Sequence, residues 1–77
     1  MDKNKFNDIL NDINPEILEN TDVDLVEDGI LDSILIMMMV SKLETAFEIC
    51  IDPDDIMPEN FESAETIWNT VSKYKEN

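Results

Sequence analysis

Residues 32–47 read DSILIMMMVSKLETAF and include the longest apolar run of this 77-residue chain. Aspartate and serine are both favoured where helices begin, because their side-chain oxygens accept hydrogen bonds from backbone N–H groups that lack partners in the first turn. Apolar residues then recur at spacings of three and four, the pattern of one buried helical face. That inward face is Ile36, Met39, Val40, Leu43, Ala46 and Phe47. The stretch therefore predicts a long helix that begins at Asp32 or Ser33 and ends at Phe47.

The N-terminal part of the chain predicts a further helix and then a long connection. Pro15 ends this helix, because a proline pushes the preceding residue out of helical conformation. Its apolar stripe is Phe6, Ile9, Leu10 and Ile13. The connection, residues 16–32, contains Gly29, the only glycine of the chain, where a positive φ is easiest. We expect the connection to pack onto the helices through apolar side chains. These are Leu25, Val26, Ile30 and Leu31.

The C-terminal part predicts a short helix and a longer one. Pro53 is expected to open a short turn or helix that runs through Met57 and is stopped by Pro58. Ser63 is expected to cap the last helix. Its apolar stripe is Ala64, Ile67, Trp68, Val71 and Tyr74. The chain contains no repeat and no flexible linker, so we expect one domain spanning 1–77. The predicted fold is all-α, a small four-helix bundle with three longer helices, a short third helix and a long first loop.

The composition excludes most catalytic chemistry. The chain contains one cysteine and no histidine, which rules out a disulfide framework and the usual zinc-binding patterns of cysteine and histidine. A serine–histidine–acid triad is impossible for the same reason. We therefore expect no catalytic residues, no metal site and no enzymatic activity in this chain. The single Cys50 has no partner cysteine and no neighbouring cation in sequence to lower its pKa, so we expect it to be unreactive.

The charge balance limits the possible partners. Five lysines face 19 acidic residues, for a net charge of −14. Nucleic acids and anionic membranes repel such a surface, whereas partners with basic patches meet it quickly. No apolar run approaches the roughly 20 residues that span a membrane, and the start lacks the pattern of a secretion signal. We expect a monomeric cytoplasmic protein.

An acidic loop with a glycine also suggests a calcium-binding EF-hand, which needs oxygen ligands at positions 1, 3 and 5, glycine at 6 and glutamate at 12. A frame that begins at Asp24 puts Val26 at position 3 and Leu35 at position 12. A frame that begins at Asp22 puts Val26 at position 5 and Glu27 at position 6. Neither frame provides the ligand set, so a calcium-binding function is disfavoured.

Residues 27–34 read EDGILDSI, and here the sequence resembles the acyl carrier protein family. Glycine, two residues, aspartate, serine and an aliphatic residue form the phosphopantetheine attachment motif of that family. The resemblance continues through residues 43–47, LETAF, and through the alternating pair Ile49 and Ile51. It extends to the acidic segment 54–56 and to residues 60–63, NFES, so that it covers nearly the whole chain.

The resemblance implies that a separate magnesium-dependent transferase attaches 4′-phosphopantetheine from coenzyme A to Ser33. The terminal thiol of that arm then holds an acyl or aminoacyl group as a thioester, supplied by a loading ligase and passed to downstream acyl-transfer enzymes. Asp32 is the matching position for transferase recognition. A helix start suits this chemistry, because its N–H groups and dipole favour a phosphate. The simpler alternative is that Ser33 only caps the helix.

The sequence departs from fatty-acid carriers on the outer side of its long helix. Leu35 and Met38 stand where such carriers have acidic residues that dock onto partner enzymes, although Glu44 remains. Three consecutive methionines cannot all face inward, because neighbouring helical positions are 100° apart. We expect Ile34, Leu35 and Met38 to form an apolar partner-binding face, with Glu44 contributing to it. This departure favours a dedicated, freestanding carrier in a specialised pathway over general fatty acid biosynthesis. D-alanyl carriers and those of polyketide and nonribosomal peptide biosynthesis resemble it in this respect. The alternative from another class is a carrier fold that binds partners through this face without modification.

Overall fold

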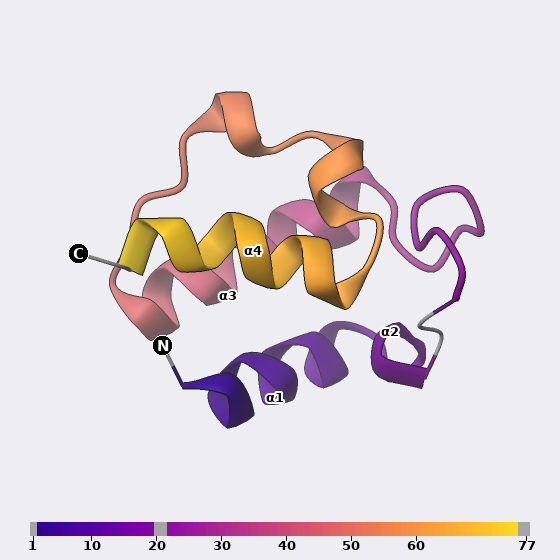
Figure 1. The fold of residues 1–77 in the computed structure, drawn as a ribbon, viewed down its shortest axis with the longest axis horizontal. Helices are drawn as coiled ribbons and strands as arrows, with labels where there is room; N and C mark the ends of the chain where they lie inside the picture. Colours follow the sequence, from indigo (N-terminus) through magenta and orange to yellow (C-terminus); the bar gives the residue numbers. More distant parts are fainter. Residues whose placement is uncertain (1, 20–21, 76–77) are drawn as a thin grey trace.

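The computed structural model describes residues 2–19 and 22–75. Its α-helices are α1 (Lys3–Ile13), α2 (Glu16–Glu19), α3 (Ser33–Phe47) and α4 (Ala64–Lys75). Two 3₁₀ turns, η1 (Pro53–Asp55) and η2 (Pro58–Phe61), lie between α3 and α4 (Figure 1). These described residues contain no strand. The predicted all-α bundle with a long first loop is confirmed.

Local hydrogen bonds and backbone conformation define the two ends of α1. The carboxylate of Asp2 accepts hydrogen bonds from the backbone N–H groups of Asn4 and Lys5, at 2.9 and 3.2 Å, and so caps α1. Asn14, which precedes Pro15, has an extended backbone with φ −164° and ψ 116°. Its side-chain oxygen accepts from the N–H of Glu16 at 2.9 Å and thereby begins the single turn of α2.

Residues 22–32, which lead to α3, pack against the body of the molecule, as predicted. Leu25 is fully buried and Leu31 almost so. The N–H of Leu25 donates to the carbonyl of Glu62 at 2.8 Å, and the N–H of Leu31 donates to the carbonyl of Leu25 at 2.9 Å. Gly29 has a φ of +77°, the left-handed conformation that glycine adopts without strain. Residues 22–32 therefore lead to Ser33 as a packed segment.

The short third helix differs from the prediction. Pro58 does not stop a helix that began at Pro53, but begins a second 3₁₀ turn of its own. Proline suits the first position of such a turn, because the N–H that it lacks has no partner there. Met57 before it is extended, with φ −131° and ψ 152°, and this separates η1 from η2. Ser63 caps α4 as predicted, and its hydroxyl oxygen accepts from the N–H of Thr66 at 3.2 Å.

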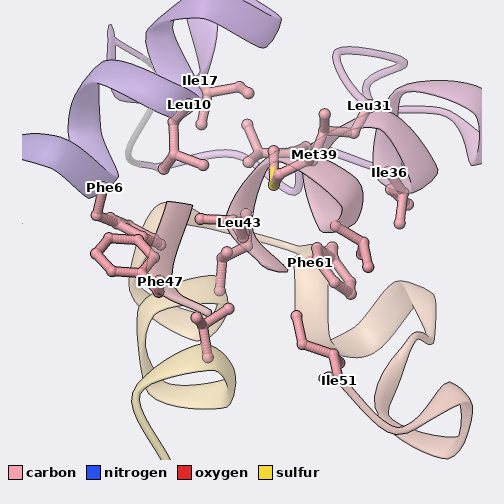
Figure 2. Packing of buried hydrophobic residues seen from close by; sticks show 14 residues of the cluster. Phe6, Leu10, Ile17, Leu31, Ile36, Met39, Leu43, Phe47, Ile51 and Phe61 are labelled. Atoms are coloured by element: carbon pink, nitrogen blue, oxygen red, sulfur yellow. The ribbon is translucent and has the colours of Figure 1, made fainter. Parts of the chain in front are cut away.

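The core forms around α3, which contributes five buried side chains to it (Figure 2). Met39 and Leu43 lie at the centre of this cluster, between side chains of the N-terminal helices and those of the segment that leads to α4. Fourteen hydrophobic residues are buried in all among the described ones. They are Phe6, Leu10, Ile17, Leu25, Leu31, Ile36, Met39, Val40, Leu43, Phe47, Ile51, Phe61, Ile67 and Val71. Because all four α-helices and η2 contribute buried side chains to this cluster, the core fixes the position of the helix start at Ser33.

Two lysines close the C-terminal end of α3. The ammonium group of Lys5 donates to the carbonyl of Ala46 at 2.9 Å, and that of Lys75 donates to the carbonyl of Phe47 at 3.0 Å. Positive charge is favourable at a helix C-terminus, where the last carbonyls lack helical partners. Glu48 ends the helix in the left-handed conformation with φ 55°. Side chains of α1 and α4 thus hold α3 at the end opposite to Ser33.

Candidate functional site

Ser33 is the first residue of α3 and is exposed. The cap of the helix is Asp32, whose carboxylate accepts a hydrogen bond from the N–H of Leu35 at 2.9 Å. Within the described part of the chain, the hydroxyl of Ser33 makes no hydrogen bond. The capping role that could have explained Ser33 therefore belongs to its neighbour, and the serine hydroxyl is left available.

The position of Ser33 suits an attached phosphate. α3 is 15 residues long, and its first N–H groups and its dipole favour negative charge at this end. Asp32 satisfies the N–H of Leu35 only, so the N–H groups of Ser33 and Ile34 remain without a helical partner. A phosphodiester on the Ser33 oxygen would lie beside these donors.

An apolar face follows Ser33 along the outer side of α3. It consists of Ile34, Met37 and Met38, whose side chains are 72%, 55% and 47% exposed. Together with Ser33 and Ser41 these residues line a shallow depression of about 460 Å³. Met37 and Met38 lie three and four positions after Ile34, and Ser41 lies three positions after Met38. These four residues therefore share one side of the helix. We call Ile34, Met37 and Met38 the apolar face.

The structure alters the composition of the face that the sequence predicted. Ile34 and Met38 are exposed as expected, but Leu35 is half-buried and packs against the core. Met37 is exposed instead. Leu35 precedes the buried Met39 by one helical turn, which places it at the edge of the inward face.

Glu44 lies apart from Ser33. The two residues are eleven positions apart in the helix, which is roughly 16 Å along the axis. The carboxylate of Glu44 accepts a hydrogen bond from the N–H of Ile51 at 2.9 Å. This contact ties the chain that leaves α3 back to the helix. The structure therefore gives Glu44 a structural contact and does not bring it together with Ser33.

A cleft of about 300 Å³ adjoins Ser33 on the side facing η1 and η2. Asp32 and Ser33 form part of its wall, and the remainder is apolar. The apolar lining is Val26, Ile36, Met37, Ile56, Met57 and Pro58. Sequence reasoning missed this cleft, because its two sides come from segments about twenty residues apart and meet only in the folded chain.

Charge is distributed unevenly along the molecule. Four of the five lysines lie at the start of α1 or the end of α4, and Figure 1 shows both on the side where α3 ends. The fifth, Lys42, forms an ion pair with Asp12 at 3.1 Å. The loop 22–32 that leads to Ser33 contains Asp22, Asp24, Glu27, Asp28 and Asp32 and no lysine. The end of the molecule with Ser33 is therefore the acidic end.

No group of three or more acidic or cysteine side chains is placed to hold a metal ion within residues 2–19 and 22–75. Cys50 is exposed and free. No helix in the described ranges is both long enough and apolar enough to cross a membrane.

A small helical bundle that presents an unengaged serine hydroxyl at the start of its central helix is suited to holding a covalently attached group. The sequence model of the family described as "Phosphopantetheine attachment site" matches residues 3–67, most of the chain. The chain belongs to this family, which implies covalently attached 4′-phosphopantetheine as its cofactor. The exposed hydroxyl of Ser33 and the free N–H groups beside it fit that group.

The chain is also similar to carrier proteins of known name. It is 40% identical over 58 residues to the D-alanyl carrier proteins of Lactococcus lactis subsp. cremoris and of Lactococcus lactis subsp. lactis. The match covers 75% of this chain and 65% of those relatives, just under two thirds of their length. No solved structure matches the chain significantly.

Proposed function

We propose that this protein is a carrier whose Ser33 bears 4′-phosphopantetheine, and that the terminal thiol of the arm holds an acyl or aminoacyl group as a thioester. The observation that supports this most directly is the exposed, unengaged hydroxyl of Ser33 at the start of α3, next to the helix cap Asp32. This position lies inside the part of the chain that the family matches.

Attachment requires the Ser33 oxygen to form a bond to phosphorus. The oxygen attacks the pyrophosphate of coenzyme A, the phosphoanhydride bond breaks, and adenosine 3′,5′-bisphosphate leaves. We assign the base that accepts the serine proton to the separate transferase. The role of the chain is to expose the hydroxyl and to stabilise the phosphodiester with the N–H groups at the start of α3. We assign Asp32 to recognition by the transferase as well as to capping.

Partner enzymes perform the chemistry on the attached group, and the chain itself is a substrate that presents it. We propose that the transferase, the loading ligase and the downstream acyl-transfer enzymes dock on the apolar face next to Ser33, with Leu35 at its edge. Methionine adapts to differently shaped surfaces, which suits a face that several enzymes contact in turn. The acidic loop 22–32 attracts partners with basic rims to this end. Glu44, farther along α3, contributes only at the periphery.

We propose that the cargo is an aminoacyl group, and specifically a D-alanyl group. The support is the 40% identity to proteins named D-alanyl carrier proteins. The apolar face agrees with it, because general fatty-acid carriers have acidic residues there. The exposed free thiol of Cys50 suits a reducing compartment, so we place this single-domain, monomeric carrier in the cytoplasm.

A second candidate function is a carrier fold that binds partners without modification. The exposed apolar face favours it, because such faces mark interaction sites whether or not a serine beside them is used. It predicts partner binding that Ser33→Ala leaves unchanged and no gain of mass with coenzyme A.

The deciding experiment is incubation with coenzyme A and a broad-specificity phosphopantetheinyl transferase, followed by intact mass measurement. We expect the mass to rise by one phosphopantetheine group. Ser33→Ala abolishes this gain, whereas the matched control Ser41→Ala, which removes an exposed hydroxyl on the same side of α3, leaves it unchanged. An unmodified wild-type chain under conditions that convert a known carrier would overturn the proposal.

A further inference from the structure

Asp55 joins η1 to the end of α4. Its carboxylate accepts a hydrogen bond from the hydroxyl of Tyr74 and lies 3.3 Å from the ammonium nitrogen of Lys73. The Tyr74 oxygen in turn accepts from the N–H of Asp52 at 3.2 Å. Two consecutive residues of α4 thus hold both the start and the end of the η1 turn.

Asp55 also connects η1 to η2. Its backbone carbonyl accepts a hydrogen bond from the side-chain amide of Asn60 at 2.8 Å. Between these two contacts the chain passes through Ile56, Met57 and Pro58, which line the cleft beside Ser33. A displacement of Asp55 therefore moves one wall of that cleft.

Few apolar contacts secure this wall. The flanking residues Ile51 and Phe61 are buried, but none of residues 52–60 is buried. Figure 1 shows the segment along the side of the molecule away from α1, outside the contact of the longer helices. A segment with little buried apolar surface opens at a lower free-energy cost than the core does. Apart from Ile56, which is half-buried against the core, the segment is held by polar contacts, and those that tie it to α4 and connect η1 to η2 converge on Asp55.

We propose that Asp55, Tyr74 and Lys73 form a latch that holds residues 52–60 against the cleft beside Ser33, and that release of the latch opens this cleft. The latch is a property of the unmodified chain. Its consequence for a carried group, which would gain or lose room between α3 and the η1–η2 segment, rests on the proposed function of Ser33. Tyr74 and Asp55 are positioning residues, since neither contacts Ser33.

The ionisation of the latch has a defined direction. The hydrogen bond from Tyr74, reinforced by Lys73, holds the pKa of Asp55 below its ordinary value, and the same hydrogen bond raises the pKa of Tyr74. The charged groups that face the pair are Lys73 from α4 and Asp52 from the η1 turn. At neutral pH Asp55 is ionised and Tyr74 is protonated, so the latch is closed. Protonation of Asp55 in acid removes the charge that Tyr74 and Lys73 bind.

Amide hydrogen exchange on the unmodified protein tests the latch. The reporters are the N–H groups of Asp55, Ile56 and Asn60, which bond within η1 and η2. Tyr74→Phe removes both the hydrogen bond to Asp55 and the one from the Asp52 N–H, so we expect it to lower their protection at least about tenfold, the equivalent of one hydrogen bond to a charged group. The amides of α1 and α3 keep their protection. The matched control is Ser72→Ala, which removes a hydroxyl that bonds only within α4.

A second variant supplies a readout that a purely structural role would not change. Asp55→Asn keeps the size of the side chain and removes its charge. We expect it to lower the protection of the same three amides at pH 7. In the wild type their protection should also fall as the pH drops through the pKa of Asp55, whereas in Asp55→Asn this pH-dependent fall should be absent. Equal protection in wild type and both variants would refute the latch. So would a uniform loss of protection in all helices, which indicates lower global stability instead. Neither result bears on the loading of Ser33, so the two proposals fail separately.

Discussion

At the scale of single residues, Asp32 caps α3 and Ser33 keeps its hydroxyl unbonded in the described part of the chain, although either residue type can cap a helix. Asp32 binds the N–H of Leu35 and so fixes the first turn of α3. The hydroxyl of Ser33 consequently has no structural task among the described residues. The two roles of Asp32, capping and recognition by the transferase, can be separated by substitution.

Asparagine caps helices about as well as aspartate, whereas alanine does not cap them. We expect Asp32→Ala to lower the free energy of unfolding by about 1 kcal/mol and to slow loading. Asp32→Asn should leave stability close to that of the wild type and still slow loading, because the carboxylate charge is absent. Urea unfolding and the rate of mass gain measure the two effects. Wild-type loading of Asp32→Asn would show that the carboxylate serves the cap alone.

The pair Asp55 and Tyr74 makes stability depend on pH at both extremes. The pKa of Asp55 is lowered from 3.8, so its stabilising contribution is full above that value and is lost as the pH falls through the lowered pKa. The pKa of Tyr74 is raised from 10.0, so its contribution is full below that value and is lost as the pH rises through the raised pKa. Urea midpoints of wild type and Tyr74→Phe should differ most between these limits, and in acid the difference should shrink to what the hydrogen bond from the Asp52 N–H contributes. A difference as large in strong acid as at pH 7 would contradict the assignment.

At the scale of elements, two adjacent methionines of α3 belong to different faces, one exposed and one buried. Met38 is exposed and belongs to the apolar face, whereas Met39 is fully buried at the centre of the core. We expect Met39→Ala to cost about 2–5 kcal/mol through lost packing and a cavity. Met38→Ala should stay within about 0.5 kcal/mol, because surface substitutions rarely exceed that. Urea unfolding of the two variants compares them directly, and equal losses would contradict the placement of the helix.

The same helix shows which features could be predicted from the sequence and which could not. The start, end and inward face of α3 could be predicted, because they follow from a local cap and a period of 3.6 residues. The sequence could not predict that Leu35 is half-buried and Met37 exposed. Both lie at the edges of the inward face, and only the packing of neighbouring segments decides which of them is covered. The hydrogen bond of Glu44 to Ile51 could not be predicted either, because it depends on the path of the chain after α3.

The cleft and the latch escaped sequence analysis for the same reason. Tyr74 and Asp55 are 19 residues apart and meet only after α4 has packed. The position of Pro53 correctly predicted a turn. Pro58 was expected only to end that turn, because proline interrupts helices, and so the second turn that begins at Pro58 was not predicted. Local signals thus predicted the helices and the serine, whereas contacts between elements required the structure.

At the scale of the whole molecule, charge dominates. Five lysines oppose 19 acidic side chains, and each lysine already has a partner within the fold, a carbonyl, a carboxylate or an aromatic ring. The remaining acidic groups repel one another. Salt screens that repulsion more than it weakens the few lysine contacts. We expect the thermal unfolding midpoint to rise between low salt and about 0.5 M NaCl, and equally in KCl. A midpoint that falls would contradict this balance.

The same charge distribution places the acidic end at Ser33 and four of the five lysines at the other end. A carrier needs its attachment site where partners arrive first, and a strongly negative loop beside the serine meets that need. The apolar face then provides contact area once a partner has arrived.

The most direct test of the account is tandem mass spectrometry of the chain after reaction with coenzyme A and a phosphopantetheinyl transferase. The proposal predicts one phosphopantetheine group, located on Ser33 in the peptide that also contains Ser41. A group on Ser41, or no group on either serine while a known carrier is converted, would contradict it.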